Sequence, residues 1–253
     1  MQALKDKIVF ITGASSGIGE ACARAFAADG ARLLLAARRL GRLDLLASEL
    51  AVPTHSISLD VRDRAVVEAA MSELPDEWSA IEILVNSAGL SRGMDKLQEA
   101  DVHDWEEMID TNVKGLLYVS RAVIPGMVAR GRGHVINLGS VAGFEVYPGG
   151  NVYCASKAAV RSISQGLRMD LLGTSIRVTN IEPGMVETEF SLVRFHGDRD
   201  RAARVYQGIQ PLTAADIAEI AVFCAGRPPH VDIAEVVVMP TAQASATQVY
   251  RKV

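Results

Sequence analysis

The sequence has few cysteines. Its three, Cys22, Cys154 and Cys224 among 253 residues, lie far apart with no CxxC or CxxH spacing. This spacing argues against a zinc site and against a disulfide framework, so we expect no metal. An odd number of scattered cysteines is typical of proteins in a reducing cytosol, and we therefore expect a cytoplasmic protein.

Long hydrophobic runs and long basic runs are also missing. The first ten residues, MQALKDKIVF, contain only a short apolar stretch, which predicts neither a signal peptide nor a membrane span. The net charge is -4 and the pI is about 5.8, so we expect neither nucleic acid nor membrane as a partner. We find no repeat, low-complexity stretch or long linker, and we interpret residues 1–253 as a single domain.

Short apolar runs alternate with helical patterns along most of the chain. Five runs are β-branched and continuously apolar, which predicts strands buried on both faces: 7–12, 32–37, 81–86, 133–138 and 175–181. A third strand in chain order at 54–59 and a weaker one at 236–239 complete a sheet of about seven strands. Helical patterns cover 17–29, 39–50, 63–73, 104–130 and 152–172. This alternation predicts an α/β fold of Rossmann type, a doubly wound parallel sheet with helices on both faces.

Two segments lie outside this pattern. Residues 190–214 are charged, compatible with helix and placed just after a strand expected to end at the active site. We interpret them as a substrate lid, with a plain surface helix as the alternative. Residues 241–253 are too polar for core, and we expect this tail either to pack on a neighbouring subunit through Val249-Tyr250 or to be disordered.

The first strand leads into a glycine-rich loop, Thr12-Gly13-Ala14-Ser15-Ser16-Gly17-Ile18-Gly19. Glycines let a backbone turn tightly and approach a pyrophosphate, and the following helix offers its unpaired N–H groups. A plain turn is the alternative, but the loop lies between a strand and a helix, as a phosphate loop requires. We therefore predict cofactor contacts at the loop residues Gly13, Ser15, Ser16, Gly17 and Ile18.

The end of the second strand distinguishes between the two nicotinamide dinucleotides. An NAD-selective site places a carboxylate there, whereas this chain has Ala36-Ala37-Arg38-Arg39. No acid repels a 2′-phosphate, and the guanidiniums of Arg38 and Arg39 can pair with one. The charge pattern thus predicts NADP(H), although Arg39 could instead simply begin a solvated helix.

Tyr153 and Lys157 are four residues apart in a helical pattern, so both project from one face. Hydride transfer to a carbonyl leaves an alkoxide that needs a proton, which a tyrosine hydroxyl can donate. A neighbouring ammonium favours the phenolate and lowers the tyrosine pKa toward the working range. Ser140 follows the fifth strand, where its hydroxyl can hold the substrate oxygen. Alone, the Tyr-x-x-x-Lys spacing would more often mark a surface helix.

The order of these motifs is more specific than any one of them. The glycine loop, the turn Asn86-Ser87-Ala88-Gly89, Asn112, Ser140, the Tyr153/Lys157 pair and Pro183-Gly184 follow one another along the chain. In this the sequence resembles the short-chain dehydrogenase/reductase family over essentially its whole length. One departure is Ser87, where the family usually has a second asparagine.

The resemblance implies a catalytic tetrad. Tyr153 would be the general acid and base, and Ser140 would orient the carbonyl. Lys157 would bind the nicotinamide ribose and tune the tyrosine, and Asn112 would hold a proton-relay water. Asp60 and Val61 would face the adenine, and residues 183–188 would line the nicotinamide. The implied cofactor contacts beyond the glycine loop are Arg38, Arg39, Asp60, Val61, Asn86, Ala88, Gly89, Tyr153, Lys157, Pro183, Gly184, Val186 and Thr188.

Within the family, the C-terminal half is similar to NADP-dependent 3-hydroxy acid dehydrogenases acting on serine and L-allo-threonine, and to sulfoacetaldehyde reductases. Both imply a small anionic alcohol and its aldehyde or ketone as substrates. We predict that Arg194, in the lid segment, takes the anion in a two-pronged hydrogen bond, and that Tyr147 walls the pocket. Arg194 could instead be one more solvated charge beside Arg199, Arg201 and Arg204.

Other functions remain open. A generic carbonyl reductase would share the chemistry but not the pocket, and an NADP-sensing protein would share the fold alone. The complete tetrad argues against a sensor, and the short chain argues against the epimerases of the extended families. The helices at 104–130 and 152–172 carry apolar residues on more than one face, which predicts an oligomer, and the resemblance implies a homotetramer.

Overall fold

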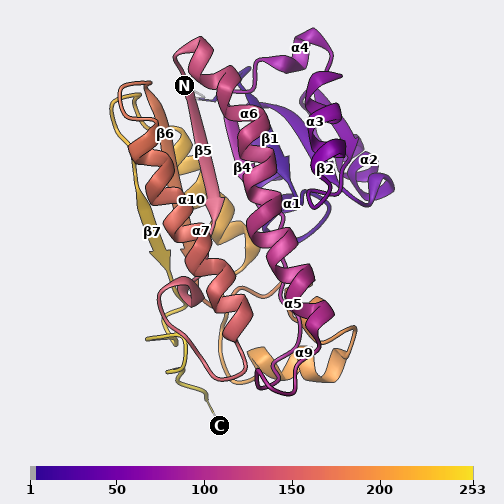
Figure 1. Cartoon of the computed structure of the whole chain (residues 1–253), viewed down its shortest axis with the longest axis vertical. Coiled ribbons are helices and arrows are strands. Elements are labelled where there is room, and N and C mark those ends of the chain that lie inside the picture. Colours follow the sequence, from indigo (N-terminus) through magenta and orange to yellow (C-terminus); the bar gives the residue numbers. More distant parts are fainter. Residues whose placement is uncertain (1–3, 253) are drawn as a thin grey trace.

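The computed structural model describes residues 4–252; residues 1–3 and Val253, at the ends of the predicted domain and tail, lie outside it. It contains a seven-stranded parallel sheet in the order β3-β2-β1-β4-β5-β6-β7 (Figure 1). The chain order reverses between β1 and β4, so the predicted doubly wound α/β fold is confirmed. The strands are β1 Ile8–Thr12, β2 Arg32–Ala37, β3 Thr54–Ser58, β4 Ile83–Asn86, β5 Gly133–Leu138, β6 Ile176–Pro183 and β7 Glu235–Val238.

Alternate side chains of the strands point to opposite faces of the sheet and form two apolar layers. Val9 and Ile11 of β1 pack in the layer covered by α1 Gly17–Ala28, α2 Leu40–Glu49 and α10 Ala214–Ala225. Ile8 and Phe10 face the opposite layer, which is covered by α3 Arg64–Ser72, α6 Leu116–Arg130 and the end of α7 Asn151–Asp170. None of the helices within residues 4–252 has the length and apolar character that crossing a bilayer requires.

The predicted helix 104–130 is divided into three parts. It begins earlier, as α5 Val102–Ile109, because the Asp101 side chain caps it by accepting from the His103 amide at 2.9 Å. A π-helical segment, η1 Asp110–Gly115, then leads into α6. A Cβ on Gly115 would lie 2.6 Å from a methyl of Val61, so glycine lets this segment approach the end of β3.

Segment 190–214 and the C-terminal end of the chain lie in the lower part of the molecule in Figure 1, below the carboxyl ends of the strands. Residues 190–214 contain two short helices, α8 Phe190–Arg194 and α9 Arg199–Tyr206. The tail folds back on its own chain, while the Tyr250 side chain is 73% exposed. The Arg251 guanidinium donates to the carbonyls of Val205 and Gln207 at the end of α9, and the Lys252 amide donates to the Gly208 carbonyl at 2.8 Å. Within residues 4–252, two α-helices had no sequence prediction, α4 Asp76–Ser79 and α10.

Candidate active site

A cleft of about 790 Å³ follows the carboxyl edge of the sheet from the glycine loop to the segment 190–214. It crosses the point between β1 and β4 where the strand order reverses, which is where open α/β sheets bind ligands. Most of the predicted site residues line it, namely Gly13, Ser15, Ser16, Gly17, Ile18, Arg38, Arg39, Asp60, Val61, Ala88, Gly89, Ser140, Tyr147, Tyr153, Lys157, Pro183, Gly184, Val186, Thr188 and Arg194.

The glycine loop forms the wall at one end of the cleft. Gly13 and Gly17 have φ angles of +69° and +56°, a region that other residues rarely adopt. A Cβ on Gly13 would lie 2.9 Å from the Ala88 backbone, and one on Gly19 would lie 2.4 Å from the Gly13 carbonyl oxygen. The loop therefore needs glycine for its own geometry, and it leaves the N-terminus of α1 open toward the cleft, as a pyrophosphate site requires.

Arg38 and Arg39 lie beside the glycine loop but have different surroundings. The Arg39 guanidinium donates to the hydroxyls of Ser15 and Ser16, at 3.1 and 3.0 Å, and lies 3.4 Å from a carboxylate oxygen of Glu189. The fold thus brings Glu189 from a distant part of the chain to a place where the local sequence has no acid. Arg38 lines the cleft and lowers the pKa of Asp60 through its charge, so both arginines make this end of the cleft positive.

Asp60 and Val61 line the cleft after β3. Arg62 holds the Asp60 carboxylate with both Nε and Nη2, the shortest contact being 2.6 Å, and lowers its pKa. The packing of Val61 against Gly115 holds this edge close to η1. The geometry gives one side of the cleft a fixed carboxylate and an apolar surface, which suits an adenine and its ribose.

Two predicted residues, Asn86 and Asn112, are not among those that line the cleft. The Asn86 amide donates to Asn137 Oδ1 at 2.9 Å and to Ser120 Oγ at 3.1 Å, between the sheet and α6. The Asn112 side chain accepts from the Leu90 amide and donates to the Leu90 carbonyl, both at 2.8 Å, and donates to Ser156 Oγ. Asn86 therefore joins side chains of β5 and α6, and Asn112 holds the Leu90 backbone.

Tyr153 lies at the other end of the cleft, on α7, and is 8% exposed. Burial raises its pKa, while the Arg194 guanidinium and a hydrogen bond with Ser140 lower it. Ser140 is itself oriented by the Ala142 amide, which donates to its hydroxyl at 3.1 Å. Two hydroxyls thus meet at one point of the wall, and the tyrosine is protonated at neutral pH.

Lys157 lies one turn further along α7 and is buried. Its ammonium donates to the Leu138 carbonyl at 2.7 Å and lies 6.0 Å from the centre of the Tyr153 ring. Burial lowers its pKa to about 8. The charge that most lowers the Tyr153 pKa is that of Arg194, whereas the spacing points to Lys157, whose ammonium donates to the Leu138 carbonyl.

Arg194 reaches Tyr153 from α8. Its guanidinium carbon lies 5.2 Å from the centre of the Tyr153 ring and 4.9 Å from that of Phe190. Its Nη2 donates to the Tyr147 hydroxyl at 2.9 Å and its Nε donates to Ser91 Oγ at 3.1 Å. A fixed cation therefore stands beside the two hydroxyls, on the side away from the glycine loop.

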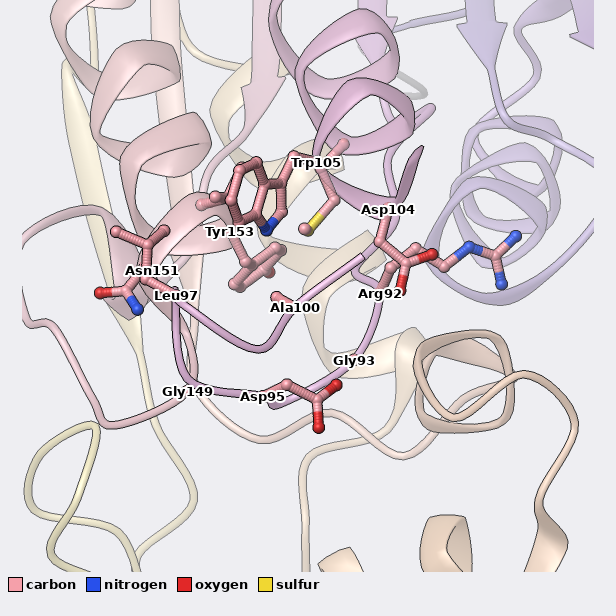
Figure 2. Close-up of a pocket in the computed structure, with 12 residues that line it drawn as sticks. Arg92, Gly93, Asp95, Leu97, Ala100, Asp104, Trp105, Gly149, Asn151 and Tyr153 are labelled. Atoms are coloured by element: carbon pink, nitrogen blue, oxygen red, sulfur yellow. The ribbon is translucent and has the colours of Figure 1, made fainter. Parts of the chain in front are cut away.

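A second, much smaller cavity lies against Tyr153 from the side of α5 (Figure 2). Trp105, Leu97 and Asn151 are among the residues that line it. Its volume of about 20 Å³ is enough for about one water molecule. Of these two cavities, the larger cleft is therefore the one that can hold a substrate and a dinucleotide.

No sequence motif pointed to several residues in or beside the cleft. Ser91 follows the turn after β4 and accepts from Arg194 of the cleft wall, and Gln243 follows β7 and lines the cleft, so both lie at the carboxyl edge of the sheet. That rule could have suggested them. Glu189 and Tyr206 carry no motif, and only the folding of segment 190–214 brings them to the cleft.

Beneath the turn that carries Ser140 lies the buried carboxylate of Glu182, on β6. Asn180 donates to its Oε1 at 2.8 Å, while its Oε2 has no hydrogen-bond partner among the described residues. A Cβ on Gly139 would lie 3.0 Å from Glu182 Cγ, so the two segments are in close contact. Burial raises the pKa of Glu182 to about 7.

Glu182 should therefore make the stability of the protein depend on pH. Its folded-state pKa is above the ordinary 4.5, so its contribution is complete below pH 4.5 and is lost as the pH rises through about 7. In the wild type, the unfolding free energy should fall by at most about 3 kcal/mol as the pH rises over this range. Glu182→Gln should remove this fall. Denaturant unfolding at pH 5 and pH 8 measures this, with the exposed Glu219→Gln as the control. Equal pH dependence in wild type and Glu182→Gln would contradict the raised pKa.

Comparisons with known proteins agree with this geometry. The family model described as short chain dehydrogenase matches residues 7–197. The NADP-dependent 3-hydroxy acid dehydrogenase of Escherichia coli is 50% identical over 240 residues, which cover 94% of this chain and 97% of that protein. The sulfoacetaldehyde reductase of Chromohalobacter salexigens is 50% identical over 239 residues, covering 93% and 94%.

A solved structure, the closed form of serine dehydrogenase complexed with NADP+, superposes with a TM-score of 0.93 at 49% identity. The match covers 97% of this chain and 100% of that one. The chain therefore belongs to the short-chain dehydrogenase family, as its motifs predict.

Proposed function

We propose that this protein is an NADP(H)-dependent oxidoreductase that interconverts a small anionic alcohol and its aldehyde or ketone. The observation that carries the proposal is the convergence of the Tyr153 and Ser140 hydroxyls with the Arg194 guanidinium on one end of a single cleft. A 3-hydroxy acid or β-hydroxy amino acid is the first candidate substrate. Sulfoacetaldehyde is the second, because both named relatives are equally similar to this chain.

The residues of the cleft fit NADP(H). The glycine loop would hold the pyrophosphate, Arg38 and Arg39 the 2′-phosphate, and Asp60 with Val61 the adenosine. Ala88, Gly89 and the stretch 183–188 would line the nicotinamide. When bound there, the cofactor supplies the hydride for reduction or accepts it for oxidation.

The chain's own residues supply the proton and the orientation. In reduction, the protonated Tyr153 donates its hydroxyl proton to the carbonyl oxygen, and the Ser140 hydroxyl holds that oxygen in place. Lys157, fixed by Leu138, would offer its remaining N–H donors to the nicotinamide ribose. Asn112 acts through Leu90 and η1, so a proton-relay water would be held by the backbone there rather than by its amide.

Arg194 would bind the anionic group of the substrate. Nε and Nη2 already have hydroxyl partners in Ser91 and Tyr147, which are neutral and can be exchanged for a carboxylate or sulfonate. A charge-assisted, two-pronged bond to such a group is stronger than the bonds to neutral hydroxyls. The partly buried position beside Phe190 limits the competition from water.

The proposal is tested by following NADPH oxidation at 340 nm with sulfoacetaldehyde, small keto acids and propanal. The reverse assay uses NADP+ with serine, L-allo-threonine, 3-hydroxypropionate and isethionate. We expect measurable turnover with the anionic compounds and weak turnover with propanal. If no anionic compound reacts faster than propanal, a generic carbonyl reductase is the better assignment. If none of the compounds, propanal included, reacts at all, an NADP-sensing role is the better assignment.

Cofactor preference depends on Arg38. Because one charge-assisted hydrogen bond contributes about 1.5–3 kcal/mol, Arg38→Asp should raise the apparent Kd for NADPH at least about tenfold. Binding measured by NADPH fluorescence gives the value, and the exposed Arg204→Asp on α9 is a control for the change of charge. Equal efficiency of the unmutated protein with NADH would contradict the assignment of NADP(H).

We further propose that segment 190–214 serves as the substrate lid of a single NADP-binding domain. Exposed apolar side chains on α6 and α7, such as Leu117, Val128 and Met169, support a homotetramer. The three cysteines occur as free, buried thiols, which supports a cytoplasmic location.

A further inference from the structure

Three consecutive residues hold the backbone and side chain of Arg194. Arg92 Nη1 donates to the Val193 carbonyl at 2.6 Å, and the Gly93 amide donates to the Arg194 carbonyl at 2.9 Å. Arg194 Nε in turn donates to Ser91 Oγ at 3.1 Å. The loop 91–93, placed after β4, therefore determines where the Arg194 guanidinium stands.

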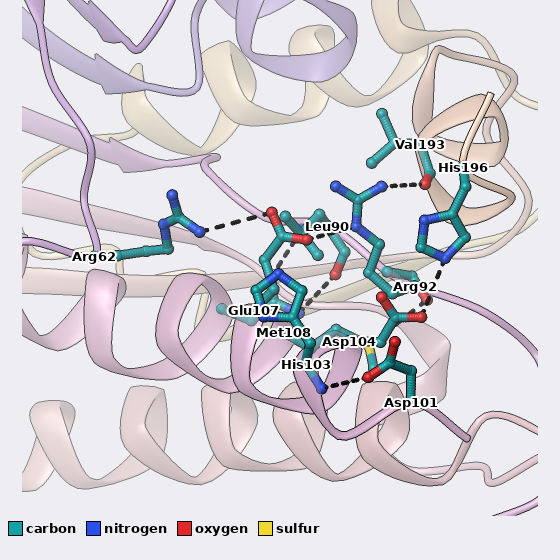
Figure 3. Close-up of polar contacts among 12 residues, drawn as sticks. Arg62, Leu90, Arg92, Asp101, His103, Asp104, Glu107, Met108, Val193 and His196 are labelled. Atoms are coloured by element: carbon teal, nitrogen blue, oxygen red, sulfur yellow. Dashed lines mark hydrogen bonds and ion pairs between the residues drawn. The ribbon is translucent and has the colours of Figure 1, made fainter. Parts of the chain in front are cut away.

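Within this loop, Arg92 is itself fixed by Glu107 of α5 (Figure 3). Arg92 Nε lies 2.6 Å from Glu107 Oε2, and the two side chains are 20% and 10% exposed. The Arg92 guanidinium holds the pKa of Glu107 below its usual range, so the carboxylate is ionised at neutral pH. The Arg92 guanidinium thus binds Glu107 through Nε and the Val193 carbonyl through Nη1.

The second oxygen of the same carboxylate faces the cofactor end of the cleft. Glu107 Oε1 lies 3.7 Å from Arg62 Nη1, and Arg62 is held by Asp60 through Nε and Nη2. Asp60 lines the cleft, whereas Glu107 and Arg92 are not among the described residues that do. Glu107 therefore connects to the cleft through its two arginine neighbours rather than by direct contact.

We propose that Glu107 is a positioning residue for the substrate-binding guanidinium: through Arg92 it holds Val193 and Arg194 against loop 91–93. The proposal rests on the function proposed above for Arg194. Without the carboxylate, the charge of Arg92 would turn toward water, and the Val193 carbonyl would lose its charged donor. The guanidinium of Arg194 would then no longer be fixed before the substrate arrives, and anion binding would include the cost of ordering it.

A second contact of α5 lies on the other side of Arg194. Asp104, one turn before Glu107, lies 3.1 Å from His196 Nε2, and the His196 side chain is 57% exposed (Figure 3). Although Asp104 is buried, the His196 side of this contact is open to solvent and the pair should contribute less than the Arg92–Glu107 pair, in which both side chains are mostly shielded. Removing the Glu107 charge is therefore the change that should release this segment.

The experiment compares Glu107→Gln with the exposed Glu106→Gln on the same helix. Glutamine keeps the shape and one oxygen acceptor but removes the charge. With saturating NADPH, we expect the KM for sulfoacetaldehyde to rise about tenfold in Glu107→Gln, as expected for one weakened charge-assisted contact. The KM for propanal and the Kd for NADPH should change less than about twofold, because Asp60 keeps Arg62 in place.

A double-mutant cycle with Arg194→Met separates positioning from a general effect on folding. If Glu107 acts through Arg194, Glu107→Gln should raise the KM for sulfoacetaldehyde no further in the Arg194→Met background. A rise of equal size for sulfoacetaldehyde and propanal, or full additivity with Arg194→Met, would overturn the proposal. Arg92→Gln removes the same link from the other side and should reproduce the result if Glu107→Gln does not fold.

A readout that needs no activity distinguishes this proposal from the proposed function. Trypsin cleavage after Arg194, followed by mass spectrometry of the fragments, reports how well Val193 and Arg194 are held. We expect faster cleavage in Glu107→Gln than in wild type or Glu106→Gln, whatever substrate the enzyme uses. Unchanged cleavage in Glu107→Gln would refute the positioning role even if the wild type shows anion-specific activity. If the wild type is inactive but Glu107→Gln is cleaved faster, only the proposed function is refuted.

Discussion

Tyr153→Phe is expected to lower kcat for carbonyl reduction about a thousandfold, because the substitution removes the proton donor. The Tyr153 hydroxyl is buried, its pKa is raised, and it is oriented by Ser140, so it is protonated and aimed when the carbonyl arrives. Phenylalanine keeps the ring that packs at 5.6 Å, centre to centre, from Phe190. NADPH binding should therefore change less than about threefold.

Single-turnover kinetics with saturating NADPH measure this loss, and NADPH fluorescence measures binding. Tyr118→Phe, on α6 and outside the residues that line the cleft, is the matched control and should be fully active. Retention of a tenth or more of wild-type turnover by Tyr153→Phe would show that another group donates the proton.

Arg194→Met should raise the KM for sulfoacetaldehyde by about thirtyfold, as expected for the loss of a charge-assisted pair of about 2 kcal/mol. Methionine preserves most of the apolar contact with Phe190, so the KM for propanal should change less than about twofold. Since the guanidinium also lowers the pKa of Tyr153, its removal should move the pH profile of alcohol oxidation to higher pH.

The control for Arg194→Met is Arg204→Met, an exposed arginine of α9 whose loss should leave both KM values unchanged. If Arg194→Met affects sulfoacetaldehyde and propanal alike, or neither, then Arg194 does not bind the anion. The choice of an anionic substrate would then lose its main physical support, while the assignment of Tyr153 would be unaffected.

The strands and the cleft could be predicted because their causes are local. Continuous β-branched runs are characteristic of strands buried on both faces, and β1, β2, β4, β5 and β6 lie where those runs stand. The interruption of 104–130 by η1 could not be predicted in this way. An apolar pattern with a period near four residues does not distinguish a π-helical turn from an α-helical one, and the close approach of Gly115 to Val61 comes from another part of the chain.

The directions of the side chains in the site were harder to predict from the sequence than their positions in the fold. Motif order identified Asn86 and Asn112, but each amide turns to a partner behind the cleft, Asn137 or Leu90, that no spacing rule indicates. Likewise the four-residue spacing brings Lys157 near Tyr153, yet the Leu138 carbonyl competes for the ammonium. Contacts between distant segments decide these cases, as they do for Glu189 beside Arg39.

The central place of β1 in the sheet has a consequence for the order of folding. Its Thr12 hydroxyl donates to the Val85 carbonyl of β4, 73 residues away in the chain, and β1 and β4 form the floor beneath the cleft. Closing so long a loop has a large entropic cost, so this pairing should form after the local helices. During refolding, nucleotide binding should therefore return later than the far-ultraviolet dichroism of the helices. The interval between the two signals would measure how long after helix formation β1 pairs with β4.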